Sequence, residues 1–102
     1  MGAAVNGTMF PAELSAHLAT IVPSVLLLAP VAVLGEVPDG AIVAFELARQ
    51  LGVKAGYVQA GRIRGYEPEA GERVVVIGDV VPAAGVVMVG KIAIPIDHGG
   101  GD

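Results

Sequence analysis

Two apolar, β-branched segments near the C-terminus are separated by only eight residues, and this spacing restricts how the chain can fold. Residues 73–77 and 86–96 are both predicted strands, and residues 78–85 lie between them. A connection that brings a second strand parallel to the first usually needs a dozen or more residues and contains a helix. The spacing therefore predicts that these two C-terminal strands pair antiparallel, as a hairpin or around a bulge.

Helical and extended patterns alternate through the rest of the chain. Apolar residues recur at helical spacing over residues 11–22 and again over residues 41–51, where Asp39 is the predicted N-cap and Gly52 the predicted left-handed residue at the C-terminal end. The other predicted strands are residues 25–29, 31–34 and 53–58, and residues 62–66 are predicted to be extended within a polar loop. This order predicts a single domain over residues 1–102, of the α/β or α+β class. Its small mixed sheet would have about four to five strands, with two helices.

The composition indicates a core of aliphatic residues and an incompletely covered surface. Hydrophobic residues make up 54% of the chain and charged residues only 16%, with two Phe, two Tyr and no Trp. So few polar side chains cannot cover a small monomer, and we expect the chain to form a homo-oligomer. The scarcity of Asn, Ser, Thr and Gln indicates a reduced amino-acid alphabet, and the sequence leaves open whether the chain is natural or engineered.

Charge and cysteine content exclude several classes of partner. The net charge is −4 and the six basic residues are scattered, with Arg62 and Arg64 as their closest grouping, so we expect no nucleic-acid partner. The absence of cysteine excludes disulfides and thiol chemistry and agrees with a cytoplasmic location. Residues 18–34 carry no charge, but Pro23 and Pro30 interrupt them, and we do not expect a membrane-spanning helix there.

Four segments resemble the type I phosphoribosyltransferases, and the orotate phosphoribosyltransferases most closely. They are VLLLAP at residues 25–30, FELARQLGVKA at 45–55, GYEPEAGERVVVI at 65–77 and VGKIAIPID at 89–97. The resemblance implies a phosphoribosyltransferase-like core. In that core the first segment is the first strand, and the third leads to the site for the diphosphate-bearing sugar.

The resemblance places a ligand site in the loop after residue 77. In the family, two adjacent acids end the strand and bind the ribose hydroxyls, and a loop of the Thr-Thr-Gly type opens a helix and binds the 5′-phosphate. Here Gly78 stands at the first acid position and Asp79 matches the second. The hydroxyl-bearing residues are replaced by proline and alanine, which offer no hydroxyl. The ligand-binding residues that the resemblance implies are Asp79, Val80, Val81, Ala83, Ala84 and Gly85.

These departures predict a domain that lacks a complete catalytic site, and the sequence names no catalytic residue. If a ligand is retained, the resemblance implies a nucleotide or sugar phosphate, with Mg²⁺ only where phosphoribosyl diphosphate is bound. No metal site is expected otherwise. The alternative is a non-enzymatic structural or designed protein that only associates with itself.

Individual residues also allow two interpretations. Asp79 either binds a ligand or caps local amides in a turn. Arg62 and Arg64 either contact a phosphate, as the nearest counterparts of the family's basic catalytic loop, or protect an exposed edge strand. Glu36 and Asp39 are either a functional pair of carboxylates or a solvated loop and its helix cap.

Overall fold

The computed structural model describes residues 11–93, and these form three helices and one mixed sheet of five strands. The helices are α1 (Pro11–Ala19), α2 (Val22–Leu27) and α3 (Asp39–Leu51), and the strands are β1 (Ala32–Glu36), β2 (Lys54–Gln59), β3 (Arg62–Gly65), β4 (Arg73–Ile77) and β5 (Val87–Ile92). The strand order is β3-β2-β1-β4-β5, and only β3 runs antiparallel to its neighbour. The predicted α/β fold with a small mixed sheet is confirmed.

The central strand is β1, which pairs in parallel with β2 on one side and with β4 on the other. Its first three residues, Ala32, Val33 and Leu34, are completely buried. Val33 faces a cluster formed with the helices, whereas Ala32 and Leu34 face a second cluster on the opposite side of the sheet. A strand covered on both faces consists of consecutive apolar residues, as this segment does.

The predicted strand over residues 25–29 is wrong, because these residues belong to α2 and the turn after it. Pro23 lies in the first turn of α2, where its missing N–H is not needed for a helical hydrogen bond. Only Val25 of this helix is buried, and Leu27 is 86% exposed. An apolar run of this length fits a helix and a strand equally well, and leucine favours a helix.

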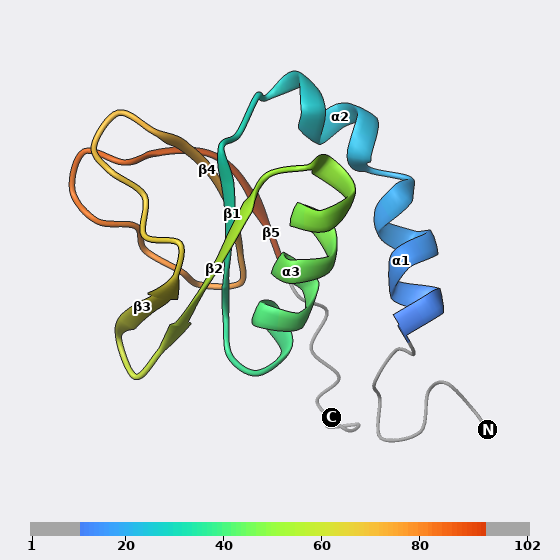
Figure 1. The fold of residues 1–102 in the computed structure, drawn as a ribbon, viewed down its shortest axis with the longest axis horizontal. Coiled ribbons are helices and arrows are strands. Elements are labelled where there is room, and N and C mark those ends of the chain that lie inside the picture. The colour runs from blue at the N-terminus through green and yellow to red at the C-terminus, as the bar shows by residue number, and fades with distance from the viewer. Residues whose placement is uncertain (1–10, 94–102) are drawn as a thin grey trace.

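The two faces of the sheet are covered in different ways. All three helices lie on one face (Figure 1), where Ala44 and Leu47 of α3 pack against Val33 and Val75. Connecting segments cover the other face, where the side chain of Val80 is buried against the sheet.

The ends of α3 agree only in part with expectation. Gly52 ends the helix in the left-handed conformation, with φ of 75°, as predicted. The N-cap, however, is Pro38, and Asp39 is the first helical residue and makes no capping hydrogen bond, so the predicted capping role of Asp39 is wrong.

The two C-terminal strands are neighbours, but they pair in parallel, so the predicted antiparallel pairing is wrong. The connection over residues 78–86 contains no helix and returns along the face opposite the helices, where Val80 and Val86 contact the sheet. Nine extended residues can span about 30 Å, whereas a five-residue strand is only about 17 Å long. An extended connection is therefore long enough to reach the start of β5 without a helix. The predicted strand over residues 86–96 is observed only over Val87–Ile92, since residues 86 and 93 are not part of it and residues 94–96 lie outside the described residues.

The end of β1 lies against the first turn of α3 with no room for a side chain. A Cβ atom added to Gly35 would lie 1.9 Å from the carbonyl oxygen of Gly40 and 2.9 Å from the Cβ of Ala44. Because the first obstacle is backbone, only a displacement of α3 would relieve the clash. Helix α3 can therefore pack in its observed position only if residue 35 is glycine.

We predict that Gly35→Ala destabilises the fold by about 3 kcal/mol or more, since relief of the clash must move a packed helix. Chemical denaturation measures the change in the free energy of unfolding. The matched control is Gly71→Ala, where no atom lies within 4 Å of the added Cβ and φ is 89°. That control should lose only about 1 kcal/mol, from backbone strain. Equal losses in the two variants would contradict the packing argument.

A hydrogen-bonded clamp holds the segment between β3 and β4. The hydroxyl of Tyr66 donates to Oε1 of Glu72 over 2.6 Å, and the amide of Glu69 donates to the same oxygen over 2.9 Å. The ammonium of Lys54 lies 5.8 Å from the centre of the Tyr66 ring. The hydrogen bond from Tyr66 is the main cause that lowers the pKa of Glu72, and the same bond raises the pKa of Tyr66.

This clamp makes stability depend on pH in a defined direction. The lowered pKa of Glu72 means that its contribution is present above its unfolded pKa, about 4.3, and is lost as the pH falls through the folded pKa. We predict that Tyr66→Phe destabilises the fold more at about pH 7 than at about pH 3. Urea unfolding at the two pH values measures the difference. Tyr57→Phe serves as the control, because the Tyr57 hydroxyl has no hydrogen bond among the described residues, and it should show no such dependence. An equal effect of Tyr66→Phe at both pH values would argue against the clamp.

Candidate functional site

The strand order reverses direction between β1 and β4. From β1 the chain continues through α3 to β2 on one side, and from β4 it continues to β5 on the other. In open α/β sheets, ligands bind outside the carboxyl ends of the strands at the point where the order reverses. The topology therefore predicts a ligand site among the residues that follow β1 and β4.

A cavity of about 380 Å³ lies at this point, a size suited to a small molecule. We call it the switch-point cavity. It is lined by residues at or just beyond the carboxyl ends of β1, β4 and β5 and by the start of α3: Glu36, Val37, Pro38, Asp39, Gly40, Gly78, Asp79, Lys91 and Ala93. The parallel pairing of β4 and β5 is what brings Lys91 to the same edge as Asp79.

Charges of both signs surround the switch-point cavity. Nζ of Lys91 lies 3.3 Å from Oδ1 of Asp79, and the side chains are 51% and 91% exposed. An ion pair this exposed is weak, so a ligand can replace either partner. The first amides of α3 have no side-chain cap, and they add the positive end of the helix dipole beside Asp39. The arrangement offers carboxylates to hydroxyl groups and an ammonium and amides to an anion.

The backbone explains why Gly78 stands where the resembling family has an acid. Its φ is 83°, a left-handed conformation that favours glycine, and its N–H donates to the carbonyl of Ile92 over 2.8 Å. An acidic residue would be strained at this position. The amide of Gly78 is already bonded within the sheet and is not free for a ligand.

The residues of the implied site spread over different environments. Asp79 lines the switch-point cavity, whereas Val80 is 6% exposed and packs against the sheet. Val81 and Ala83 line a second cavity. The carbonyl of Gly85 accepts a hydrogen bond from the amide of Gly71 over 2.8 Å. Ala84 is exposed and lines neither of the two cavities. Asp79 is thus separated from the other implied residues.

Sequence reasoning did not identify Lys91 as a site residue. Lys91 lies within β5 and is opposite Val76 of β4 in the parallel register. Lys91 lies at the cavity because of that register, and the predicted antiparallel pairing implied a different register. Glu36 and Asp39 were considered as a carboxylate pair, and the structure places both on the lining of the same cavity.

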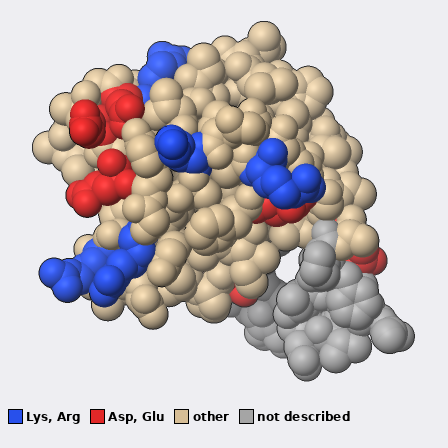
Figure 2. Space-filling view, viewed as in Figure 1, with Lys and Arg blue, Asp and Glu red and all other residues tan. Residues whose placement is uncertain are grey.

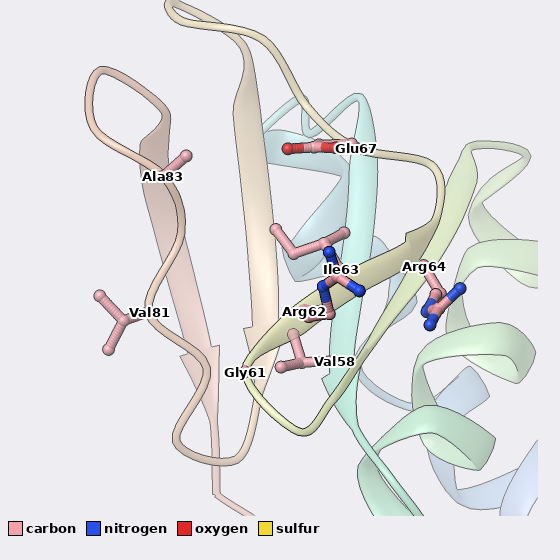
Figure 3. A pocket seen from close by; sticks show the side chains of 8 residues that line it. All are labelled: Val58, Gly61, Arg62, Ile63, Arg64, Glu67, Val81 and Ala83. Carbon is pink, nitrogen blue, oxygen red and sulfur yellow. The ribbon is translucent and has the colours of Figure 1, made fainter.

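The second cavity, of about 640 Å³, is larger and lies on the face of the sheet away from the helices (Figure 3). We call it the β3 cavity. Its lining comes from β2, β3 and the two connecting segments that flank β4: Val58, Gly61, Arg62, Ile63, Arg64, Glu67, Val81 and Ala83. The switch-point cavity remains the better candidate for the function that the resemblance implies, because its position follows from the strand order.

Residues 11–93 contain neither a metal-binding cluster nor a membrane-spanning helix. No three His, Cys, Asp or Glu side chains in this range gather to bind a metal ion. None of the helices in the same range has the length and apolar character needed to cross a membrane.

The chain is similar to a known protein in fold. No protein-family model matches it, and no curated protein sequence does. The structure of UMP synthase from Leishmania donovani matches 83% of this chain with a TM-score of 0.59 and 20% identity, and the match covers 22% of that protein's length. A likeness at this identity is one of fold alone. It agrees with the α/β fold described above.

Proposed function

We propose that this chain is a phosphoribosyltransferase-like domain that binds a sugar phosphate or a nucleotide in the switch-point cavity and does not transfer phosphoribosyl groups. The observation that carries this proposal is the parallel pairing of β4 and β5. It brings Asp79 and Lys91 to the carboxyl edge of the sheet, beside the start of α3. This is the place where open α/β sheets bind such ligands.

The chemistry of the lining fits the two parts of a sugar phosphate. The ammonium of Lys91 and the uncapped amides of α3 are suited to a phosphate group. The carboxylates of Glu36 and Asp79 are suited to ribose hydroxyls, which donate hydrogen bonds to them. A phosphate that displaces Asp79 from Lys91 frees that carboxylate for the sugar.

Three features argue against catalysis. The acid that the family places at position 78 is a glycine here, held in a left-handed conformation. Pro82 has no N–H, and its neighbours in the connection carry no hydroxyl, so the connection lacks a phosphate cradle. No helix follows within residues 78–86, and its dipole is therefore missing as well.

Magnesium would have to arrive with the ligand. Residues 11–93 gather no set of three carboxyl or imidazole side chains, so this part of the chain offers no site for a resident metal ion. The diphosphate of a phosphoribosyl ligand binds Mg²⁺ through its own oxygens.

NMR titration with ribose 5-phosphate, and with phosphoribosyl diphosphate plus Mg²⁺, tests the proposal. We expect amide shifts at residues 36–40, 78–79 and 91, with a dissociation constant on the order of 1 mM. Lys91→Ala should weaken binding about tenfold, since it removes a charge-assisted hydrogen bond. Arg49→Ala, remote from the cavity, should leave binding unchanged, and no diphosphate should be released when a nucleobase is added. Absence of shifts at several millimolar ligand, or equal binding by Lys91→Ala, would refute the binding site.

A second candidate function, self-association, is favoured by the contrast between the two edges of the sheet. The β3 edge is short, with four residues, and carries the exposed Arg62 and Arg64. The β5 edge has six residues, and Lys91 is its only charge. Val87 and Met88 on this strand are 42% and 48% exposed. Proteins usually protect an open sheet edge with charge, as at β3.

The surface beside the β5 edge is also apolar. A Cβ added to Gly90 would lie 3.2 Å from Leu28, so the end of α2 adjoins this strand. Leu26 and Leu27 of α2 are exposed. We propose that a second copy pairs antiparallel with β5 about a twofold axis, which covers both apolar surfaces at once. The local register shift opposite Val74 and Val75 limits this pairing to part of the strand.

Light scattering with Met88→Lys tests the self-association proposal. The unaltered chain should be a dimer, and Met88→Lys should shift it to monomer, because a charge at the centre of an apolar pairing surface is costly to bury. Val81→Lys is the control, since Val81 is 87% exposed and lies on a different surface, and this variant should remain a dimer. A monomeric wild-type chain at high concentration would exclude this function.

A further inference from the structure

The arginines of β3 lie on the same face of the β2–β3 hairpin as Tyr57. The antiparallel register pairs Tyr57 with Arg64, and it pairs Gln59 with Arg62. Paired residues of neighbouring strands project to one face, and so do residues two apart on one strand. The side chains of Arg62 and Arg64 therefore share a face with the ring of Tyr57, whereas Ile63 projects to the opposite face.

This shared face adjoins α3. The ring of Phe45 on α3 lies 6.0 Å from the ring of Tyr57, measured between centroids. Figure 3 shows Arg64 on the side of β3 nearer to α3, while Val81 lies across the cavity on the connection. In Figure 1, α3 lies beside β1 and β2, and β3 forms the edge of the sheet beyond them. Phe45, Tyr57 and Arg64 thus follow one another from the helix to the uncovered edge strand.

Two of the six basic side chains have no partner within residues 11–93, and both belong to this face. Arg62 and Arg64 are exposed and make neither a hydrogen bond nor an ion pair in this range. In Figure 2 a group of basic side chains projects from the lower left of the molecule, where Figure 1 shows β3. The other four basic residues each have a partner: Arg49 with Glu46, Lys54 with the ring of Tyr66, Arg73 with the carbonyl of Leu28, and Lys91 with Asp79.

Exposed apolar side chains lie next to these free charges. Phe45 is 47% exposed and is the one exposed aromatic residue within residues 11–93. Ile42 is 56% exposed and lies three residues earlier on α3, which places it on the same side of the helix. Edge protection explains the two arginines of β3, but it does not explain an exposed phenylalanine beside them. We call this set of residues the hairpin surface: Ile42, Phe45, Tyr57, Arg62 and Arg64.

The composition of the hairpin surface is that of a protein-binding site. Tyrosine, phenylalanine and arginine are enriched where proteins meet, and tyrosine and arginine often dominate the binding energy. Neither of the two cavities described above includes Phe45 or Tyr57, so the surface is not shaped around a small molecule. Two free arginines are too few for a nucleic acid, whose binding proteins neutralise several phosphates. A second copy bound about a twofold axis would bring the arginines of both copies together, and like charges repel.

We propose that the hairpin surface binds an acidic segment of a partner protein, whose carboxylates pair with Arg62 and Arg64 and whose apolar side chain packs against Ile42 and Phe45. A guanidinium offers two parallel N–H donors that match the two oxygens of a carboxylate. The remaining charge of this chain, −4 in total, disfavours an acidic partner on its other surfaces and so directs it to this one. The hairpin surface lies outside the switch-point cavity, and the proposal does not depend on the function of that cavity.

NMR titration of the full chain with an acidic peptide, in which glutamates surround a Leu-Phe pair, tests the proposal. We expect amide shifts at residues 42, 45, 57, 62 and 64, with a dissociation constant on the order of 1 mM. The same peptide with lysine in place of glutamate should cause no shifts. Sodium chloride at about 0.5 M should reverse the shifts that the acidic peptide causes, because salt screens exposed charges. Absence of shifts at several millimolar acidic peptide, or equal shifts with the basic peptide, would overturn the proposal.

The same spectra identify two other occupants of the hairpin surface. If the amides of this surface shift when the chain alone is diluted, a second copy occupies it. If a thymidine oligonucleotide shifts them at a lower concentration than the acidic peptide does, the surface binds nucleic acid. Either result would replace the acidic protein segment and refute the proposal.

Variants separate the hairpin surface from the other sites. The double variant Arg62→Ala and Arg64→Ala should weaken peptide binding at least about tenfold, through loss of charge-assisted hydrogen bonds. Lys91→Ala removes an exposed cation at the opposite edge of the sheet and should bind the peptide as the unaltered chain does. Ile42→Ala should weaken binding about threefold through loss of apolar contact, whereas Leu27→Ala, on the exposed side of α2, should not. Unchanged binding by the double variant would overturn the proposal, even if the switch-point cavity binds a sugar phosphate.

Discussion

The carbonyl of Gly40 occupies the space that a side chain on Gly35 would fill, and the layout of the molecule depends on this contact. It lets the chain leave the central strand and enter α3 at once. The start of α3 therefore lies at the carboxyl end of β1, and the helix then packs Ala44 and Leu47 onto the sheet. The following strand, β2, returns parallel to β1. The same contact gives the switch-point cavity one of its walls and the positive end of a helix.

The two faces of the sheet differ in how much they depend on helices. On one face, α1, α2 and α3 form a layer with Val33 and Val75 beneath it. On the other, two connecting segments cover Ala32 and Leu34 with little more than Tyr66, Val80 and Val86. The thinner cover leaves room beside β3 for a cavity. A small domain with few aromatic residues thus obtains a two-sided core from extended chain, because an extended segment can bury single residues while its backbone stays at the surface.

The elements that were predicted correctly are those whose local sequence pattern agrees with their tertiary environment. Helix α3 has both helical periodicity and a terminal glycine, and β4 is a β-branched run with a turn before it. The segment at residues 25–29 was mispredicted because an apolar run does not indicate by itself whether it lies in a sheet. The parallel pairing of β4 and β5 was missed because the usual rule assumes a helical crossover. That one error also concealed Lys91, since only the parallel register places it near Asp79. Asp79 was predicted as a site residue, but the residues that surround it could be identified only from the tertiary fold.

The connection between β4 and β5 has a consequence for how such a domain can change. Gly78 and Gly85 are held by hydrogen bonds to Ile92 and Gly71, and Val80 and Val86 pack against the sheet, whereas residues 81, 83 and 84 are exposed. Exposed segments between anchored residues tolerate insertion, because few contacts are lost. A longer segment, even one long enough to form a helix, can therefore be added between Val80 and Gly85 without altering the strand register. A domain with this short connection and a domain with a phosphate-binding helix would then differ only in one surface segment.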